Sequence, residues 1–364
     1  MPIIPIIAIT AGDVAGIGPE VLVKALRDRK VNEACRSLAI CDPEVLRRAT
    51  ELVGCASSVE IRTLDHFPQN RQELEAALSG VPPGCLLCWN PCSPALNVMP
   101  GKVSGIGGDC AFQYLSAAIQ LAKSGIVDAI CTAPLNKAAL HAAGHHYPGH
   151  TEILAQQCGV SDFAMMLHLP ESRIAPVRPL IRTPGDRSDA TGHGLSIVHV
   201  TLHTSIASVP TLLTTAGIME KTGLMLDFLK RIGCQRAAIA VCALNPHAGE
   251  EGLFGEEEQT MIAPAVRQFS QATAQVAGPL PVDTLIRRAV AGEFDGVVAM
   301  YHDQGHIPVK LLGFDAAVNI TLGLPIVRTS PTHGTAYDRA WNPTTPADPA
   351  GMIESVLTAA RLCR

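Results

Sequence analysis

The chain has 364 residues, of which 47% are hydrophobic and 17% charged, with a net charge of −5. This composition predicts a globular protein with a large core, long enough for two ordinary domains, and it argues against disorder. The weakly acidic balance provides no basic surface for nucleic acid. The opening MPIIPIIAIT is apolar but short and lacks a basic flank. We therefore interpret it as a buried first strand, and we expect neither a signal peptide nor a membrane span.

Apolar runs typical of strands alternate with helical patterns along the chain. The runs lie at 6–10, 38–41, 129–133, 238–244 and 296–300. Because nearly every position in them is apolar, these strands should be buried on both faces of a largely parallel sheet with intervening helices. Residues 111–122 have the apolar spacing of a helix, and Gly125 follows where a C-terminal cap belongs. The predicted fold class is therefore α/β.

The twelve cysteines are scattered, and many lie inside apolar runs, where cysteine behaves as a small buried hydrophobe. This usage is typical of a reducing cytoplasm. Cys85, Cys88 and Cys92 have the spacing C-x-x-C-x-x-x-C, which also fits a metal site. No fourth thiol or histidine follows at zinc or iron–sulfur spacing, so structural cysteines on a strand are the favoured interpretation.

Residues 169–194 interrupt the alternation, because they are rich in Pro, Gly, Arg, Asp and Ser. The segment predicts a long surface excursion. Loops of this length are often functional, and a solvated insertion is the alternative.

A glycine-rich turn, TAGDVAGIGPE, follows the first strand. Gly12, Gly16 and Gly18 permit a tight turn, and Pro19 suits the first position of a helix. The free N–H groups at such a helix start can bind an anion. Val21 stands where the dinucleotide fingerprint G-x-G-x-x-G requires its third glycine, so a standard Rossmann site is not supported. A plain turn between strand and helix is the alternative.

Three histidines share one position relative to the predicted strands. His203, His247 and His302 each follow an apolar run at its carboxyl end. In open parallel sheets this edge is where ligands bind. Three imidazoles that converge there would leave coordination positions open, as in a catalytic metal site. Each could equally be an ordinary surface or core histidine.

Further polar groups follow the same pattern of strand and loop. His150 and Thr151 stand in P-G-H-T-E, where Thr151 is expected to cap a helix. Lys310, Asn319 and Arg328 supply donors suited to phosphate or carboxylate. Their spacing fits no single helix face, so we expect them on successive elements.

Several blocks of sequence together resemble the 4-hydroxythreonine-4-phosphate dehydrogenase family. The blocks are GDVAGIGPE, TAPLNKAAL, GHTE, LNPHAGE, GPLPVDT, AMYHDQGHIPVK and AVNITLGLPIVRTSPTHGTA, and they span nearly the whole chain in order. The resemblance implies an isocitrate/isopropylmalate dehydrogenase-like fold, with two α/β/α domains, a cleft between them and a homodimer whose active site lies at the interface. We expect 1–137 with 321–364 to form a cofactor-side domain. Residues 138–320 would form a metal- and dimer-side domain carrying the insertion at about 169–194.

The resemblance also implies a role for each candidate residue. One divalent ion (zinc, magnesium, cobalt or manganese) would be held by His203, His247 and His302. The substrate would be bound by His150, Thr151, Lys310, Asn319 and Arg328. NAD or NADP would be bound by Gly12, Asp13, Gly16, His333, Gly334 and Thr335. The catalytic candidates are His150, Lys310 and Asp303, with Lys310 and Asp303 as alternatives for the general base.

The implied reaction is the oxidation of 4-phosphooxy-L-threonine to 2-amino-3-oxo-4-phosphooxybutanoate. This product decarboxylates to 3-amino-2-oxopropyl phosphate, in vitamin B6 biosynthesis in the cytoplasm. Two departures from the family are Val14, where proline is usual, and the segment 169–194, which leads toward His203. The substrate therefore stays open, with D-threonate 4-phosphate, D-erythronate 4-phosphate or a dihydrodiol carboxylate as alternatives. The rival classes are a metal-dependent hydrolase, which three histidines would also suit, and a non-catalytic small-molecule-binding protein.

Overall fold

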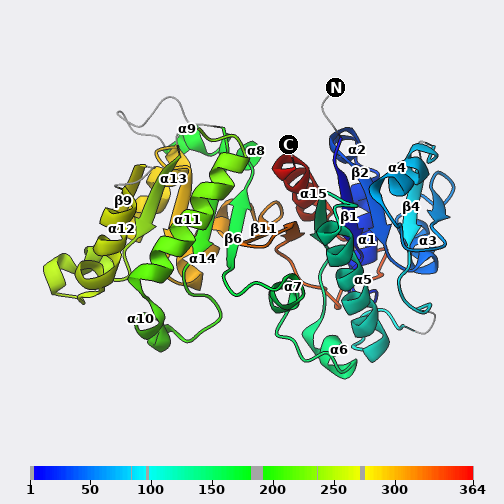
Figure 1. Cartoon of the computed structure of the whole chain (residues 1–364), viewed down its shortest axis with the longest axis horizontal. Coiled ribbons are helices and arrows are strands. Elements are labelled where there is room, and N and C mark those ends of the chain that lie inside the picture. Colours follow the sequence, from blue (N-terminus) through cyan, green and yellow to red (C-terminus); the bar gives the residue numbers. More distant parts are fainter. Residues whose placement is uncertain are drawn as a thin grey trace. The chain divides into compact units, whose positions relative to one another are not determined.

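The computed structural model describes residues 4–82, 84–95, 98–181, 192–235, 237–270 and 275–363. Contacts within the chain define two compact units, Met1–Phe163 with Leu324–Arg364, and Ala164–Gly323. Each unit contains a sheet with helices packed on it (Figure 1), which confirms the predicted α/β class. Within the described ranges, no helix combines the length and apolar character needed to span a membrane.

The first unit is built on a parallel sheet with the strand order β3-β4-β2-β1-β5-β12. Its strands are β1 (Ile6–Thr10), β2 (Arg36–Ile40), β3 (Glu60–Thr63), β4 (Cys85–Trp89), β5 (Ala129–Thr132) and β12 (Val327–Pro331). Its helices are α1 (Gly18–Leu26), α2 (Arg29–Ala34), α3 (Pro43–Leu52), α4 (Arg71–Ser79), α5 (Gly105–Lys123), α6 (Lys137–Ala142), α7 (His150–Cys158) and α15 (Ala350–Leu362). Strand β1 is buried at all five positions, as its continuous apolar run predicts.

Local signals in the sequence explain where the longest helix of this unit begins and ends. The hydroxyl of Ser104 accepts a hydrogen bond from Gly107 N at 3.0 Å and so caps α5. Gly125 follows its end with φ +68°, a conformation that glycine adopts at little cost. The helix predicted from the apolar spacing and its predicted end near Gly125 are both confirmed.

The second unit contains a mixed sheet with the strand order β11-β6-β7-β10-β8-β9. Its strands are β6 (Ala164–Leu169), β7 (Leu195–His199), β8 (Ala238–Cys242), β9 (Gln275–Leu280), β10 (Gly296–Ala299) and β11 (Val318–Leu322). Its main helices are α10 (Val209–Leu212), α11 (Thr215–Arg231), α12 (Ala263–Ser270), α13 (Val282–Ala291) and α14 (His302–Gly313). Strands β7, β10, β8 and β9 are parallel, whereas β6 runs antiparallel to both β7 and β11. The antiparallel β6–β7 pair arises because consecutive strands lie side by side without a crossover helix that would return the chain to the opposite edge.

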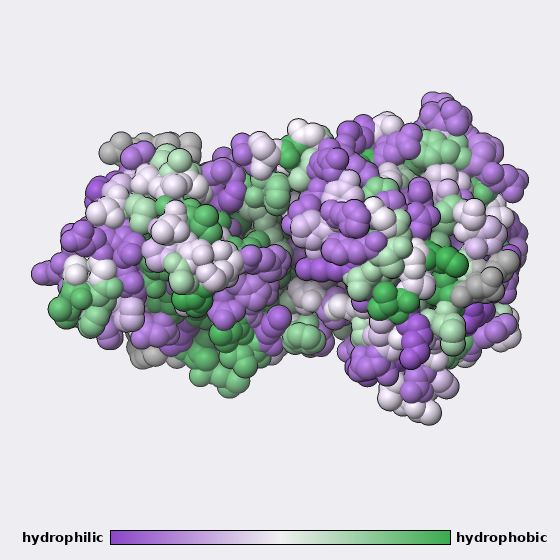
Figure 2. Space-filling model, turned by 90° about the horizontal axis from the view of Figure 1, so that it is seen from below, coloured by the Kyte–Doolittle hydropathy of each residue, from purple (hydrophilic) through white to green (hydrophobic). Residues whose placement is uncertain are grey.

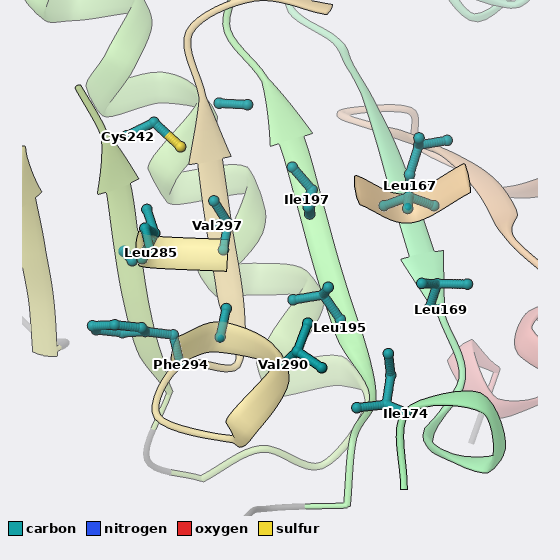
Figure 3. Packing of buried hydrophobic residues seen from close by; sticks show 14 of the residues in the cluster. Leu167, Leu169, Ile174, Leu195, Ile197, Cys242, Leu285, Val290, Phe294 and Val297 are labelled. Atoms are coloured by element: carbon teal, nitrogen blue, oxygen red, sulfur yellow. The ribbon is translucent and has the colours of Figure 1, made fainter. Parts of the chain in front are cut away.

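The core of this unit fixes the strands that lead to the candidate residues. Leu195 and Ile197 of β7, Val297 of β10 and Leu285 of α13 belong to one cluster of buried hydrophobic side chains (Figure 3). The other face packs on α11 so closely that a Cβ on Gly296 would lie 2.7 Å from Met225 Sδ. Because both faces are filled, the strand ends are rigid supports for the loops that follow them.

The two ends of the segment 169–194 are held together by hydrogen bonds. It begins with the short helices α8 (Glu171–Ile174) and α9 (Arg178–Ile181). The guanidinium of Arg178 is buried and pairs with both carboxylate oxygens of Glu171. Gly194 N donates to Glu171 Oε2 at 3.1 Å, so this carboxylate joins the two ends of the segment. Residues 182–191 of the predicted insertion lie outside the described residues.

The three cysteines with metal-like spacing have three different partners. The thiol of Cys85 donates to the Glu60 carboxylate at 3.3 Å. The thiol of Cys88 donates to the carbonyl of Cys41 at 3.0 Å. That of Cys92 reaches the sulfur of Cys110 at 3.6 Å. This arrangement supports the structural interpretation of the spacing, and all twelve cysteines are free thiols.

Candidate functional site

The glycine turn after β1 is shaped by close contact with two other loops of the first unit. Gly12 has φ +65°, and a Cβ there would lie 2.2 Å from Pro134 O. A Cβ on Gly16 would lie 2.8 Å from Thr335 O, the carbonyl that accepts a hydrogen bond from Ile17 N at 3.0 Å. Only glycine fits at both positions. The structure thus brings the predicted cofactor residues Gly12, Gly16 and Thr335 into one loop cluster.

Asp13 lies inside this turn and is fully buried. Its carboxylate accepts hydrogen bonds from Tyr337 Oη at 2.5 Å and from Ala15 N at 3.0 Å. Burial raises the pKa of Asp13, and these two hydrogen bonds oppose that shift. Because both oxygens have protein donors, the side chain braces the turn against the loop that contains Tyr337.

His333 and Gly334 lie in that second loop. The ring of His333 donates through Nδ1 to Gly334 O at 3.1 Å. Its Nε2 is buried and has no hydrogen-bond partner within the described ranges. Burial lowers the pKa of His333, which favours a neutral ring with a lone pair on Nε2. This unsatisfied acceptor is suited to a ligand donor.

Arg328 and His150 form a second polar group in the first unit. Arg328 lies on β12 and is only 2% exposed, and its Nη2 and Nε donate to Thr132 Oγ1 at 2.8 and 3.2 Å. Burial lowers the pKa of Arg328 to about 10, so the guanidinium stays charged at neutral pH. Burial and the charge of Arg328 hold the pKa of His150 well below its usual value, although a hydrogen bond to the Ala133 backbone opposes the shift. A buried cation beside a neutral imidazole is suited to an anionic ligand.

Thr151 does not cap the helix that follows, so this prediction is wrong. Helix α7 begins at His150, and Gly149 is its N-cap without any side-chain capping bond. Gly149 has φ 171° and ψ −166°, an extended backbone that introduces the helix directly. Thr151 therefore lies in the first turn of α7, beside His150.

In the second unit, His302 begins α14 directly after β10. Its Nδ1 lies 2.7 Å from Asp303 Oδ1. When Nδ1 donates to this carboxylate, the lone pair of the neutral ring is on Nε2. Gln304 accepts from Met300 N at 2.7 Å and donates to Ala243 O at 2.8 Å. The amide of Gln304 thus connects the start of α14 to the ends of β8 and β10.

Two further histidines lie beside His302. The rings of His302 and His306 are stacked, with centroids 3.6 Å apart and an interplanar angle of 8°. His306 Nδ1 lies 3.2 Å from Nε2 of His199, the last residue of β7. Burial lowers the pKa of His199 to about 3 and that of His306 to about 4, so both rings are neutral near pH 7. Sequence reasoning missed both, although the i, i+4 spacing from His302 to His306 was a signal that they share a helix face.

His247 lies in a strained turn after β8. The backbone of residues 247–251 is left-handed throughout, with φ between 44° and 81°, and four of these five residues are not glycine. Such conformations cost about 1–2 kcal/mol per non-glycine residue. Glu258 is buried below the turn, and its Oε1 accepts from Leu244 N and Asn245 N, both at 2.8 Å. Its Oε2 accepts from Asn245 Nδ2 at 3.0 Å. These bonds hold the strained turn in place.

The three predicted metal ligands are only partly assembled. His203 and His302 have ring centroids 5.9 Å apart. His247 instead faces Phe254, at a centroid distance of 6.3 Å. Within the part of the chain that the structure describes, no three His, Cys, Asp or Glu side chains are grouped closely enough to hold a metal. The donor chemistry of His203 and His302 fits a divalent ion, and a three-histidine site requires His247 to join them.

Lys310 and Asn319 also belong to the second unit. Lys310 is exposed in the last turn of α14, with Nζ 5.9 Å from the ring centre of Phe314. Asn319 lies on β11, and its Oδ1 is buried without a hydrogen-bond partner in the described ranges. A buried, unsatisfied amide oxygen is costly, and a ligand hydroxyl or amine would satisfy it.

The fold is that of an α/β protein, with the buried Arg328 beside the neutral His150 in its first unit. The sequence profile described as pyridoxal phosphate biosynthetic protein PdxA matches residues 33–359. The chain therefore belongs to the PdxA family, which confirms the resemblance seen in the sequence.

The relatives of this chain are named as dehydrogenases. It is 41% identical to D-threonate 4-phosphate dehydrogenase of Cupriavidus necator, over 99% of this chain and 97% of the relative. It is 40% identical to 4-hydroxythreonine-4-phosphate dehydrogenase of Desulfosudis oleivorans, over 92% of this chain and 90% of the relative. A crystal structure of 4-hydroxythreonine-4-phosphate dehydrogenase from Burkholderia phymatum is 41% identical, covers 99% of this chain and 98% of its own, and has a TM-score of 0.78. These matches place the chain among oxidoreductases.

Proposed function

We propose that this protein is an NAD(P)-dependent dehydrogenase that oxidises a secondary alcohol of a 4-phosphorylated four-carbon acid. The first candidate substrate is 4-phosphooxy-L-threonine, whose 2-amino-3-oxo-4-phosphooxybutanoate product decarboxylates to 3-amino-2-oxopropyl phosphate, a reaction of vitamin B6 synthesis. D-threonate 4-phosphate is the second candidate, because relatives at about 40% identity carry either name. The observation that carries the proposal is the buried Arg328 guanidinium beside the neutral imidazole of His150, a pair suited to a phosphate or carboxylate.

Four side chains are assigned to the substrate, together with Thr151, which adjoins His150. Arg328 would bind an anionic group in a bidentate manner, and His150 would accept or donate a hydrogen bond next to it. Asn319 Oδ1, buried and unsatisfied among the described residues, would accept a hydrogen bond from a substrate hydroxyl or amine. Lys310 Nζ would bind a second anionic group or transfer the proton of the alcohol.

The same proposal assigns a divalent ion (zinc, magnesium, cobalt or manganese) to His203, His247 and His302. When bound, such an ion polarises an alcohol oxygen and stabilises negative charge. The hydrogen bond between His302 Nδ1 and Asp303 Oδ1 orients the imidazole so that Nε2 would be the ligand atom. Because Asp303 is engaged in this way, Lys310 is favoured over Asp303 for the proton transfer.

The dinucleotide is assigned to the glycine turn at Gly12–Gly16 and to residues 333–335. Support comes from the contact between Gly16 and Thr335 and from the unsatisfied His333 Nε2. Because Asp13 is engaged by protein donors, it would shape this site rather than contact the cofactor directly.

We further propose a homodimer formed through the second unit. Figure 2 shows apolar patches on a largely hydrophilic surface. Among the described residues, most of the large hydrophobic side chains that are exposed lie in Ala164–Gly323, namely Leu180, Ile206, Leu212, Leu253, Phe254, Ile307, Leu311 and Phe314. Such a concentration favours a protein contact. The free thiols favour the cytoplasm as the compartment.

The test is NADH or NADPH formation by metal-loaded protein with a panel of substrates. The panel contains 4-phosphooxy-L-threonine, D-threonate and D-erythronate 4-phosphates, and an unphosphorylated dihydrodiol carboxylate. Turnover of one phosphorylated acid that is lost in Arg328→Met, with the fold retained, supports the proposal and identifies the substrate. Absence of reduction with every compound, despite bound metal, would refute it and leave a hydrolase or a binding protein.

A further inference from the structure

Two thiols far from the candidate ligand residues in sequence form a close pair in the first unit. Cys92 follows β4, and Cys110 lies on α5. The thiol of Cys92 donates to Cys110 Sγ across 3.6 Å. Cys92 is half-buried, whereas Cys110 is 3% exposed. Cys92 is therefore partly exposed to solvent, and Cys110 is buried next to it.

The surroundings of the pair fix both sulfurs. Asn90 Oδ1 accepts from Cys92 N at 3.2 Å and also lies 3.2 Å from Cys92 Sγ, so this amide anchors the loop residue. Cys110 is held by its helix. Donation from Cys92 lowers the pKa of Cys110, while the same shared proton raises the pKa of Cys92. Both shifts have the same cause, the direct contact between the two sulfurs.

The other cysteines nearby differ from this pair. Cys41 and Cys88 are completely buried, and burial raises the pKa of each thiol, that of Cys88 to about 12. The Cys88 thiol is also committed to a carbonyl oxygen. Buried, protonated thiols react slowly. Cys92 and Cys110 differ from them because their sulfurs are in contact and Cys92 is only half-buried.

We propose that Cys92 and Cys110 form a modification site at which a peroxide converts two neighbouring thiols into an intramolecular disulfide. One thiolate attacks a peroxide oxygen, the O–O bond breaks, and a sulfenic acid and water form. The second sulfur attacks the sulfenic sulfur, the S–O bond breaks, and an S–S bond and a second water form. Two thiols thus lose two protons and two electrons, and hydrogen peroxide is reduced to two molecules of water.

The disulfide would cross-link a segment that supports the glycine turn. Gly101, between the two cysteines, donates from its N to Ala15 O at 2.8 Å. Ser104, which caps α5, also lies in this segment. Closing the loop restricts the unfolded chain, so the oxidised protein should unfold at a higher temperature than the reduced protein.

The experiment exposes the reduced full-length protein to hydrogen peroxide, then alkylates and digests it. Mass spectrometry should find one peptide pair joined through Cys92 and Cys110, and titration of the denatured protein should find two fewer thiols than the twelve of the reduced chain. Cys92→Ser should abolish the joined peptides. Cys158→Ser removes another half-buried cysteine and should leave them unchanged.

Thermal unfolding supplies the second measurement. Peroxide should raise the midpoint of the wild-type chain, dithiothreitol should reverse the rise, and Cys92→Ser should show neither change. Sulfenic or sulfinic acid at Cys92 or Cys110 without cross-linking would overturn the proposal. So would resistance of both thiols to excess peroxide, or a disulfide that pairs either with another cysteine.

Discussion

Replacement of Glu258 should destabilise the protein and release the turn that carries His247. The carboxylate is 3% exposed and accepts hydrogen bonds from Leu244 N and Asn245 N at 2.8 Å each. A Cβ on Gly249 would lie only 2.7 Å from Glu258 Oε2, so the turn is packed directly on this side chain. Only an acceptor of the size of a carboxylate can satisfy both backbone donors at once.

The magnitude follows from the donors that Glu258→Ala leaves unpaired. Each buried N–H without an acceptor costs about 1–3 kcal/mol, so the two together cost about 2–6 kcal/mol. Domains have a stability of about 5–15 kcal/mol, and the variant should therefore still fold. Glu258→Gln keeps the acceptor oxygen and should cost about 1–2 kcal/mol, the difference between charged and neutral hydrogen bonds.

Urea unfolding of the metal-free chain measures these costs, with Glu256→Ala as the matched control. The side chain of Glu256 is exposed, so its removal should change stability by less than about 0.5 kcal/mol. Calorimetric titration with Zn²⁺ should show weaker binding to Glu258→Ala and near-normal binding to Glu258→Gln. If Glu258→Ala cost no more than the control, the carboxylate would not be holding the turn, and this reasoning would be wrong.

Three other substitutions and one chelation experiment follow from the same structure. Arg328→Met should raise the KM for the phosphorylated substrate about 10–100-fold, the equivalent of one lost charge-assisted interaction, and an unchanged KM would remove Arg328 from the substrate. Gly12→Ala should destabilise the chain by more than about 1 kcal/mol in urea unfolding, since φ is +65° and the new Cβ would meet a carbonyl oxygen; wild-type stability would contradict this contact. Burial lowers the pKa of His199 to about 3 in the folded state, so below about pH 6.5 the unfolded chain binds more protons than the folded chain. The free energy of unfolding should therefore fall as the pH drops from about 6.5 toward 4. In urea titrations of the metal-free protein, His199→Phe should reduce this dependence on pH. Chelation with EDTA should abolish dehydrogenase activity, Zn²⁺ should restore it in the wild type but not in His302→Ala, and full activity after chelation would exclude a required ion.

Local sequence patterns were sufficient for the elements whose conformation depends on neighbouring residues or that bury a continuous apolar run. Strand β1, the turn that begins at Gly12, and helix α5 with its stop at Gly125 could all be predicted, because periodicity and glycine conformations depend on neighbouring residues. The candidate residues Arg328 and His333 were also found from sequence blocks. The burial of Arg328, and the lack of a partner for His333 Nε2 among the described residues, were not predictable in the same way.

The sequence by itself thus determined the α/β class and the family, and it predicted candidate ligand residues. Only the tertiary structure decided which of them meet. It placed His199 and His306 against His302, put His247 in a left-handed turn above Glu258, and joined Cys92 to Cys110. The contact of His199 with His306 and that of Cys92 with Cys110 link different elements of the chain. They depend on strand order and burial, which no local pattern of residues encodes.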